Sequence, residues 1–64
     1  MQPHQERVVA EKSELDEKLV KLKVLIHESQ TYQSLDGAEK MRLLRQFIHM
    51  EDYPKVLGER IAAF

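Results

Sequence analysis

The chain has 64 residues and no cysteine, and its ten Lys and Arg nearly balance eleven Asp and Glu, for a formal net charge of −1. Disulfides and thiolate metal sites are therefore excluded as supports for so small a core, and the balanced charge argues against a protein that binds duplex nucleic acid. No apolar run reaches the length of a membrane span, and residues 1–5 are too polar for a signal peptide. We expect one domain whose remaining support is self-association.

A helix is predicted over residues 4–29. Pro3 suits its first turn, where a missing N–H costs nothing, and no helix-breaking residue follows within this range. A heptad stripe, the pattern of a face that packs on another helix, consists of Val8, Leu15, Leu19, Leu22 and Ile26, with Lys12 as a polar interruption. A second apolar stripe consists of Val9, Val20 and Val24. Two stripes are typical of a helix that is buried from two sides.

The polar face of this helix carries two Glu-to-Lys pairs at the i,i+4 spacing, Glu14 with Lys18 and Glu17 with Lys21. Such ion pairs stabilise a helix by about 0.2–0.5 kcal/mol each. We expect both pairs to form.

Residues 30–36 are predicted to connect two helices. The segment is polar, apart from Tyr32 and Leu35, whose side chains we expect to pack against the end of a hairpin. Asp36 is expected to cap the next helix, with Glu39 reaching back to it in a variant of the capping box.

A second helix is predicted over residues 37–64. One heptad frame consists of Leu43, Phe47, Met50, Pro54, Leu57, Ile61 and Phe64, and a second stripe consists of Met41, Leu44 and Ile48. Pro54 is expected to kink or break the helix, because a proline removes one backbone hydrogen bond and clashes with the preceding turn. The predicted fold is all-α: an antiparallel two-helix hairpin with a kinked second helix, forming one domain over residues 1–64. Its second stripes mark an assembly surface.

No catalytic signature is present, since the serines lack a nucleophile elbow and no glycine-rich phosphate loop occurs. We therefore expect a protein that is not an enzyme and needs no cofactor. His27 and His49 lack the H-x-x-x-H spacing of a helical metal site, so no metal ligands are predicted.

Basic residues along the first helix allow two interpretations. Lysines on a helix are usually solvated supports of the surface. In an oligomer, however, they could line a cleft in which the ring of His4 stacks on a base and a lysine such as Lys18 holds a phosphate.

Two motifs connect the chain to a known family. The sequence from Arg7 to Leu19 reads R-V-x-x-E-K-x-x-L-D-E-K-L, and the sequence from Tyr53 to Ile61 reads Y-x-x-V-L-x-x-R-I. Over residues 4–61 the chain resembles a family of small tailed-phage proteins that includes the second type of anti-CBASS protein. The resemblance implies a helical hairpin that assembles as a hexamer and binds cyclic dinucleotides or trinucleotides without cleaving them. It also implies that the chain acts in the cytoplasm of an infected bacterial host and keeps the effector of CBASS immunity silent.

The resemblance also suggests ligand-binding residues. His4 stands where the family has a stacking aromatic residue, although its ring is smaller. The lysine that meets the phosphates is either Lys18 or Lys21, depending on the alignment of the N-terminus. Arg60 matches an arginine of the trinucleotide pocket, and Pro54 is a departure from the family's unbroken helix.

Two other functions remain open from the residues alone. The second stripes could bind a helix of a host or phage protein, which would make the chain a protein-interaction module. The other hypothesis is a small regulator that binds nucleic acid, and the balanced charge argues against it.

Overall fold

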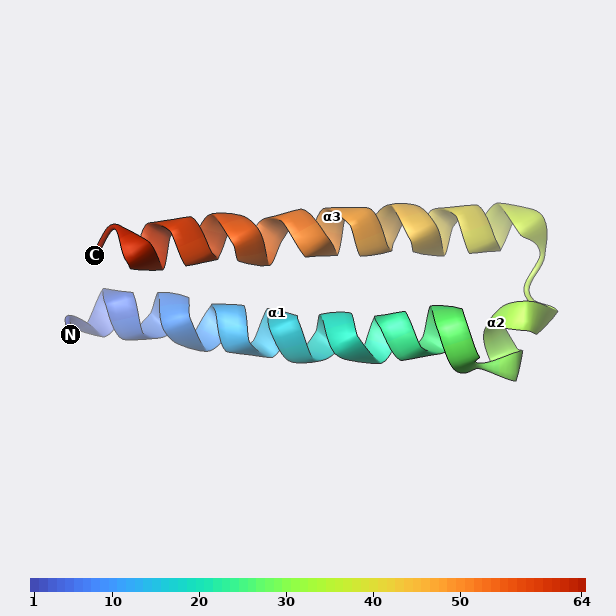
Figure 1. The fold of residues 1–64 in the computed structure, drawn as a ribbon, viewed down its shortest axis with the longest axis horizontal. Coiled ribbons are helices and arrows are strands. Elements are labelled where there is room, and N and C mark those ends of the chain that lie inside the picture. The colour runs from blue at the N-terminus through green and yellow to red at the C-terminus, as the bar shows by residue number, and fades with distance from the viewer.

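The computed structural model describes all 64 residues as a helical hairpin, which confirms the all-α prediction. Helix α1 is Pro3–Glu28, the short helix α2 is Gln30–Ser34 and helix α3 is Gly37–Ala62. The long helices lie side by side and antiparallel, so both termini are at the same end (Figure 1). The hairpin measures 45 × 15 × 13 Å, as expected for helices of 26 residues that rise about 1.5 Å per residue.

Helix α1 begins where the sequence predicts. Pro3 occupies the first turn, and the backbone N–H of Gln2 donates to Oε1 of Gln5 at 2.9 Å. The helix ends at Glu28, and the backbone N–H of Ser29 donates to the carbonyl of Leu25 at 3.3 Å. The C-terminus of α1 is therefore capped by a backbone hydrogen bond.

The predicted connection is itself partly helical, which corrects the two-helix description. Ser29 caps α2, because its Oγ accepts from the N–H of Thr31 at 3.0 Å. Tyr32 is buried against Leu22 and Ile26, with Leu35 packed beside them, as expected. The ammonium of Lys40 lies 5.5 Å from the centre of the Tyr32 ring, within the range of a cation–π contact. The short helix thus places an aromatic side chain under the end of the hairpin.

Helix α3 runs unbroken from its cap to Ala62, so the expected break at Pro54 is absent (Figure 1). Oδ1 of Asp36 accepts from the N–H of Glu39 at 2.8 Å, which confirms the predicted cap. Pro54 is buried. Its ring occupies a position of the heptad stripe at which a leucine would be usual. Burial of this ring against α1 offsets the backbone hydrogen bond that the helix loses there.

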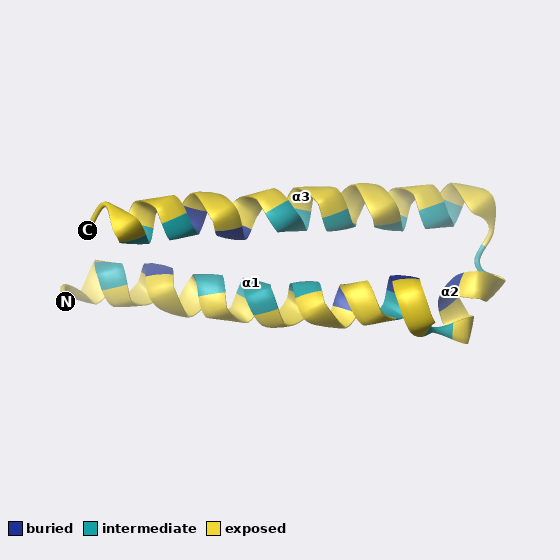
Figure 2. Ribbon diagram, viewed as in Figure 1, coloured by how far each residue is buried: buried dark blue, intermediate teal, exposed yellow.

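The core is a narrow seam between α1 and α3 (Figure 2). Only six of the 64 residues are buried. They are Val8, Leu22, Ile26, Tyr32, Pro54 and Leu57. Because most of these are members of the two predicted heptad stripes, the stripes do face each other. Burial of each large apolar side chain contributes about 1.5–3 kcal/mol, so a seam this thin gives a hairpin of modest stability.

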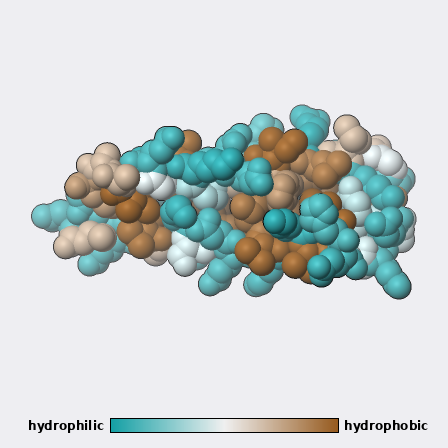
Figure 3. Space-filling view, in the orientation of Figure 1, coloured by the Kyte–Doolittle hydropathy of each residue, from teal (hydrophilic) through white to brown (hydrophobic).

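The second stripes remain outside this seam, as predicted. Val20 is 62% exposed, Ile48 55% and Met41 60%. Figure 3 shows hydrophobic surface on one face of the hairpin, in patches between hydrophilic side chains. No helix combines the length and the apolar composition needed to cross a membrane.

Candidate functional site

The first side of the seam is defined by a hydrogen bond between the long helices. The hydroxyl of Tyr53 donates to Oε2 of Glu11 at 2.5 Å. Residues spaced seven apart lie on one line along a helix of a hairpin, and we call such a line a column. Because Glu11 and Tyr53 are in contact, their two columns face each other across the seam. We call this side the Glu11–Tyr53 flank. Its two columns consist of His4, Glu11, Lys18 and Leu25 on α1 and Glu39, Gln46, Tyr53 and Arg60 on α3.

The opposite side of the seam is more apolar, and we call it the Val9–Ile48 flank. Its residues include Val9, Ser13, Asp16 and Val20 on α1 and Met41, Leu44, Ile48, Glu51, Lys55 and Gly58 on α3. These residues are assigned to the same side because Asp16 of α1 lines one hollow together with Lys55 and Gly58 of α3. Leu44 shares the heptad column of Gly58, and Met41 and Ile48 share that of Lys55.

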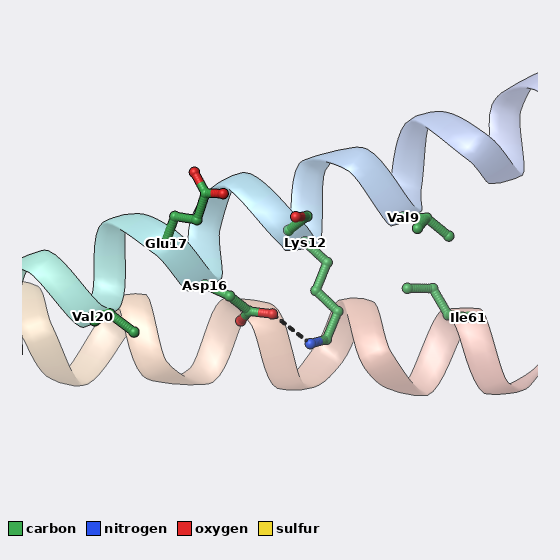
Figure 4. A pocket seen from close by; sticks show the side chains of 7 residues that line it. Val9, Lys12, Asp16, Glu17, Val20 and Ile61 are labelled. Atoms are coloured by element: carbon green, nitrogen blue, oxygen red, sulfur yellow. Dashed lines mark hydrogen bonds and ion pairs between the residues drawn. The ribbon is translucent and has the colours of Figure 1, made fainter.

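The largest hollow of the surface lies on the Val9–Ile48 flank and has a volume of about 420 Å³. Figure 4 shows Val9 and Ile61 facing each other across it, while Lys12 reaches the carboxylate of Asp16. The Nζ–Oδ2 distance of this ion pair is 2.8 Å. Because the only cation of the hollow is already paired and Glu17 adds a second carboxylate, the hollow does not favour an anionic ligand.

None of the ligand-binding residues predicted from the sequence lines that hollow. His4, Lys18 and Arg60 all lie on the Glu11–Tyr53 flank, and Lys21 lies one column further out. The register that pairs Glu11 with Tyr53 places His4 opposite Arg60, about 10 Å nearer the termini. It places Lys18 opposite Gln46, about 10 Å nearer α2.

One hairpin therefore brings together only part of the predicted set. His4 and Arg60 lie at the same end of the same flank. Lys18 and Lys21 follow His4 by about 21 and 25 Å along α1. A compact ligand that contacts both His4 and Lys18 must therefore take them from different chains.

The four predicted side chains are exposed, and their cations are free of internal partners. The two ion pairs of the chain join Lys12 to Asp16 and Arg42 to Glu39. The expected pairs of Lys18 with Glu14 and of Lys21 with Glu17 are absent, so this prediction was wrong. An exposed pair gains little, because holding two long side chains in one geometry costs entropy. Lys18, Lys21 and Arg60 consequently form no ion pair within the chain.

Tyr53 opens the second family motif but was not among the ligand-binding residues predicted from the sequence. Its side chain is 49% exposed, and with Val56, Leu57 and Arg60 it lines a shallow hollow of about 240 Å³. The hydrogen bond to Glu11 raises the pKa of the tyrosine above its ordinary value of 10.0. The negative charge of Glu11 and partial desolvation act in the same direction, and Arg60 opposes them. The hydroxyl is thus a neutral donor over the physiological pH range.

The histidines do not form a metal site with other ligands. His27 and His49 fall in outer columns on different flanks, and no three possible metal-ligating side chains gather anywhere in the chain.

The fold and the Glu11–Tyr53 flank define a small helical hairpin that presents free cations and a tethered aromatic ring on one side. The chain belongs to the Sequestin family, whose model matches residues 2–63. The name of the family denotes sequestration, and this confirms the resemblance to a family of sequestering proteins. No curated protein and no solved structure matches the chain.

Proposed function

We propose that this Sequestin-family protein binds cyclic dinucleotides or trinucleotides of CBASS immunity and holds them without cleaving them. The observation that carries the proposal is the match to the Sequestin family over nearly the whole chain. The free cations Lys18, Lys21 and Arg60 support it, because each can form charge-assisted hydrogen bonds to a phosphate. The chain would then be a phage protein that acts in the cytoplasm of the infected host, where it withdraws the messenger from its effector.

Sequestration by this hairpin calls for several copies of the chain, and we propose a hexamer. A single hairpin keeps His4 and Lys18 too far apart for one compact ligand. The exposed side chains Val20, Met41 and Ile48 offer apolar surface that a second copy can bury. Packing through the Val9–Ile48 flank would leave the Glu11–Tyr53 flank open to the nucleotide.

Isothermal titration of the purified protein against 3′,3′- and 2′,3′-linked cyclic dinucleotides and trinucleotides tests the proposal. We expect saturable binding of at least one member of the panel. After heat denaturation of the complex, chromatography should recover that nucleotide unchanged. A folded oligomer that binds no member of the panel would refute the proposal. Recovery of a linear product would show that the protein hydrolyses the nucleotide and does not merely sequester it.

The exposed apolar side chains of the Val9–Ile48 flank also favour a second candidate, a protein-interaction module that binds a partner helix. This candidate predicts a different state in solution from the nucleotide-binding hexamer. The hairpin would be monomeric and would form a stoichiometric complex with one host or phage protein. Light scattering of the purified chain, alone and with that partner, separates the two candidates.

A further inference from the structure

Tyr53 is held in place by a contact that bridges the hairpin. Most of the other side-chain hydrogen bonds join residues three or four apart on one helix. The bond from Tyr53 to Glu11 instead spans 42 positions of sequence. An exposed tyrosine ordinarily samples several rotamers, but this hydroxyl is tied to α1 at 2.5 Å. The ring is therefore half exposed, and its hydroxyl is hydrogen-bonded to the opposite helix.

The surroundings of the ring suit a nucleotide. Leu57, which is 3% exposed, forms the floor of the hollow, and Val56, which is 53% exposed, forms a wall. Arg60 follows Tyr53 by seven residues and shares its column, about 10 Å further along α3. An aromatic face for a base and a guanidinium for a phosphate thus lie in sequence along one groove.

We propose that Tyr53 stacks on a base of the cyclic nucleotide whose phosphate Arg60 binds, and that Glu11 is a positioning residue that holds the ring. This inference rests on the proposed function. Glu11 acts only through the hydroxyl of Tyr53, so an amide at position 11 can replace its carboxylate as the acceptor. The ligand class is a cyclic oligonucleotide bound by face-to-face stacking, a contact that tolerates any base.

Four variants test the inference by titration with the nucleotide that the wild type binds. Tyr53→Leu removes the aromatic face, and we expect its Kd to rise roughly 5- to 150-fold, the range that matches about 1–3 kcal/mol per stacked base. Tyr53→Phe keeps the ring but loses the tether, so its loss should be smaller, and Glu11→Ala should match it. Glu11→Gln keeps an acceptor and should bind as the wild type does. Light scattering of each variant reports whether its assembly is intact.

Tyr32→Phe is the matched control, because it also removes one phenolic hydroxyl but does so at a buried ring far from the groove. This variant provides a second measurement, since Tyr53 is then the only tyrosine. Stacking should quench the fluorescence of Tyr53 as the ligand saturates the protein. A purely structural tyrosine would show no such quenching.

The outcomes separate this inference from the proposed function. If the wild type binds no cyclic nucleotide, the proposed function fails. If the wild type binds and Tyr53→Leu binds equally well, the proposed function stands and the stacking role of Tyr53 is overturned. If Tyr53→Leu does not assemble, the fluorescence measurement decides, and unchanged emission at saturation overturns the inference.

Discussion

A Cβ atom added at Gly58 would lie 3.4 Å from Cε of Lys12. The aliphatic stem of Lys12 thus passes over Gly58 at van der Waals distance on its way to the ion pair with Asp16. Lys12 interrupts the apolar stripe of α1, and its stem lies beside Gly58 of the opposite helix with room left for one methyl group.

Gly58→Ala should therefore stabilise the hairpin. The added methyl group meets Lys12 at an ordinary contact distance, and alanine in a helix is more favourable than glycine by about 0.5–1 kcal/mol. Chemical denaturation followed by circular dichroism measures the gain. Loss of assembly at unchanged helicity would show instead that Gly58 is needed for close approach of a neighbouring chain.

Pro54→Leu should raise the free energy of unfolding by about 1–3 kcal/mol. Leucine can fill the same buried position and restores the N–H that proline lacks, while proline within a helix costs about 3 kcal/mol. Thermal unfolding of both proteins at equal concentration measures the difference. If the variant is less stable than the wild type, the shape of the proline ring is itself part of the packing of the seam.

The tether between Tyr53 and Glu11 should make stability depend on alkaline pH. The pKa of Tyr53 is raised in the folded chain above the ordinary 10.0, so the folded state holds this proton more tightly than the unfolded state does. The contribution is fully present below pH 10 and is lost as the pH rises through the folded pKa. Denaturation at pH 8 and pH 11 should show a larger fall for the wild type than for Tyr53→Phe. Equal falls would mean that the hydroxyl bond does not persist in solution.

Lys18→Ala and Arg60→Ala should each weaken nucleotide binding roughly 10- to 150-fold, which corresponds to about 1.5–3 kcal/mol for a hydrogen bond to a charged group. Both side chains are exposed and outside the internal ion pairs, so assembly should be unchanged. Arg45→Ala is the matched control, because Arg45 is exposed and shares no column with either flank. If either variant dissociates the assembly, that residue has a structural role in place of a ligand-binding one.

The seam could be predicted from sequence because heptad spacing is a local signal. The stripe through Leu22 and Ile26 identified the inward face of α1, and Asp36 identified the start of α3. Helix α2 was missed because its five residues depend on the burial of Tyr32, a tertiary contact. Pro54 was expected to kink or break α3, and the helix is not broken there, because packing of the ring against α1 offsets the local cost of proline.

The candidate site was less accessible to prediction. His4, Lys18, Lys21 and Arg60 came from motif spacing, which says nothing about distances within one hairpin. The relation between Glu11 and Tyr53 depends on the antiparallel register, and no local pattern gives that register to within one heptad. The ion pairs depend on side-chain rotamers, so equal i,i+4 spacings led to a pair at Lys12 and to none at Lys18.

The thin seam has a consequence for the evolution of the chain. Only six residues are buried, and substitutions at exposed helical positions usually change stability by no more than about 0.5 kcal/mol. Most of the flank residues, including Lys18 and Arg60, can therefore change identity without endangering the hairpin. If the flank binds a nucleotide as proposed, its residues can diversify to match new variants of that ligand while the fold is conserved.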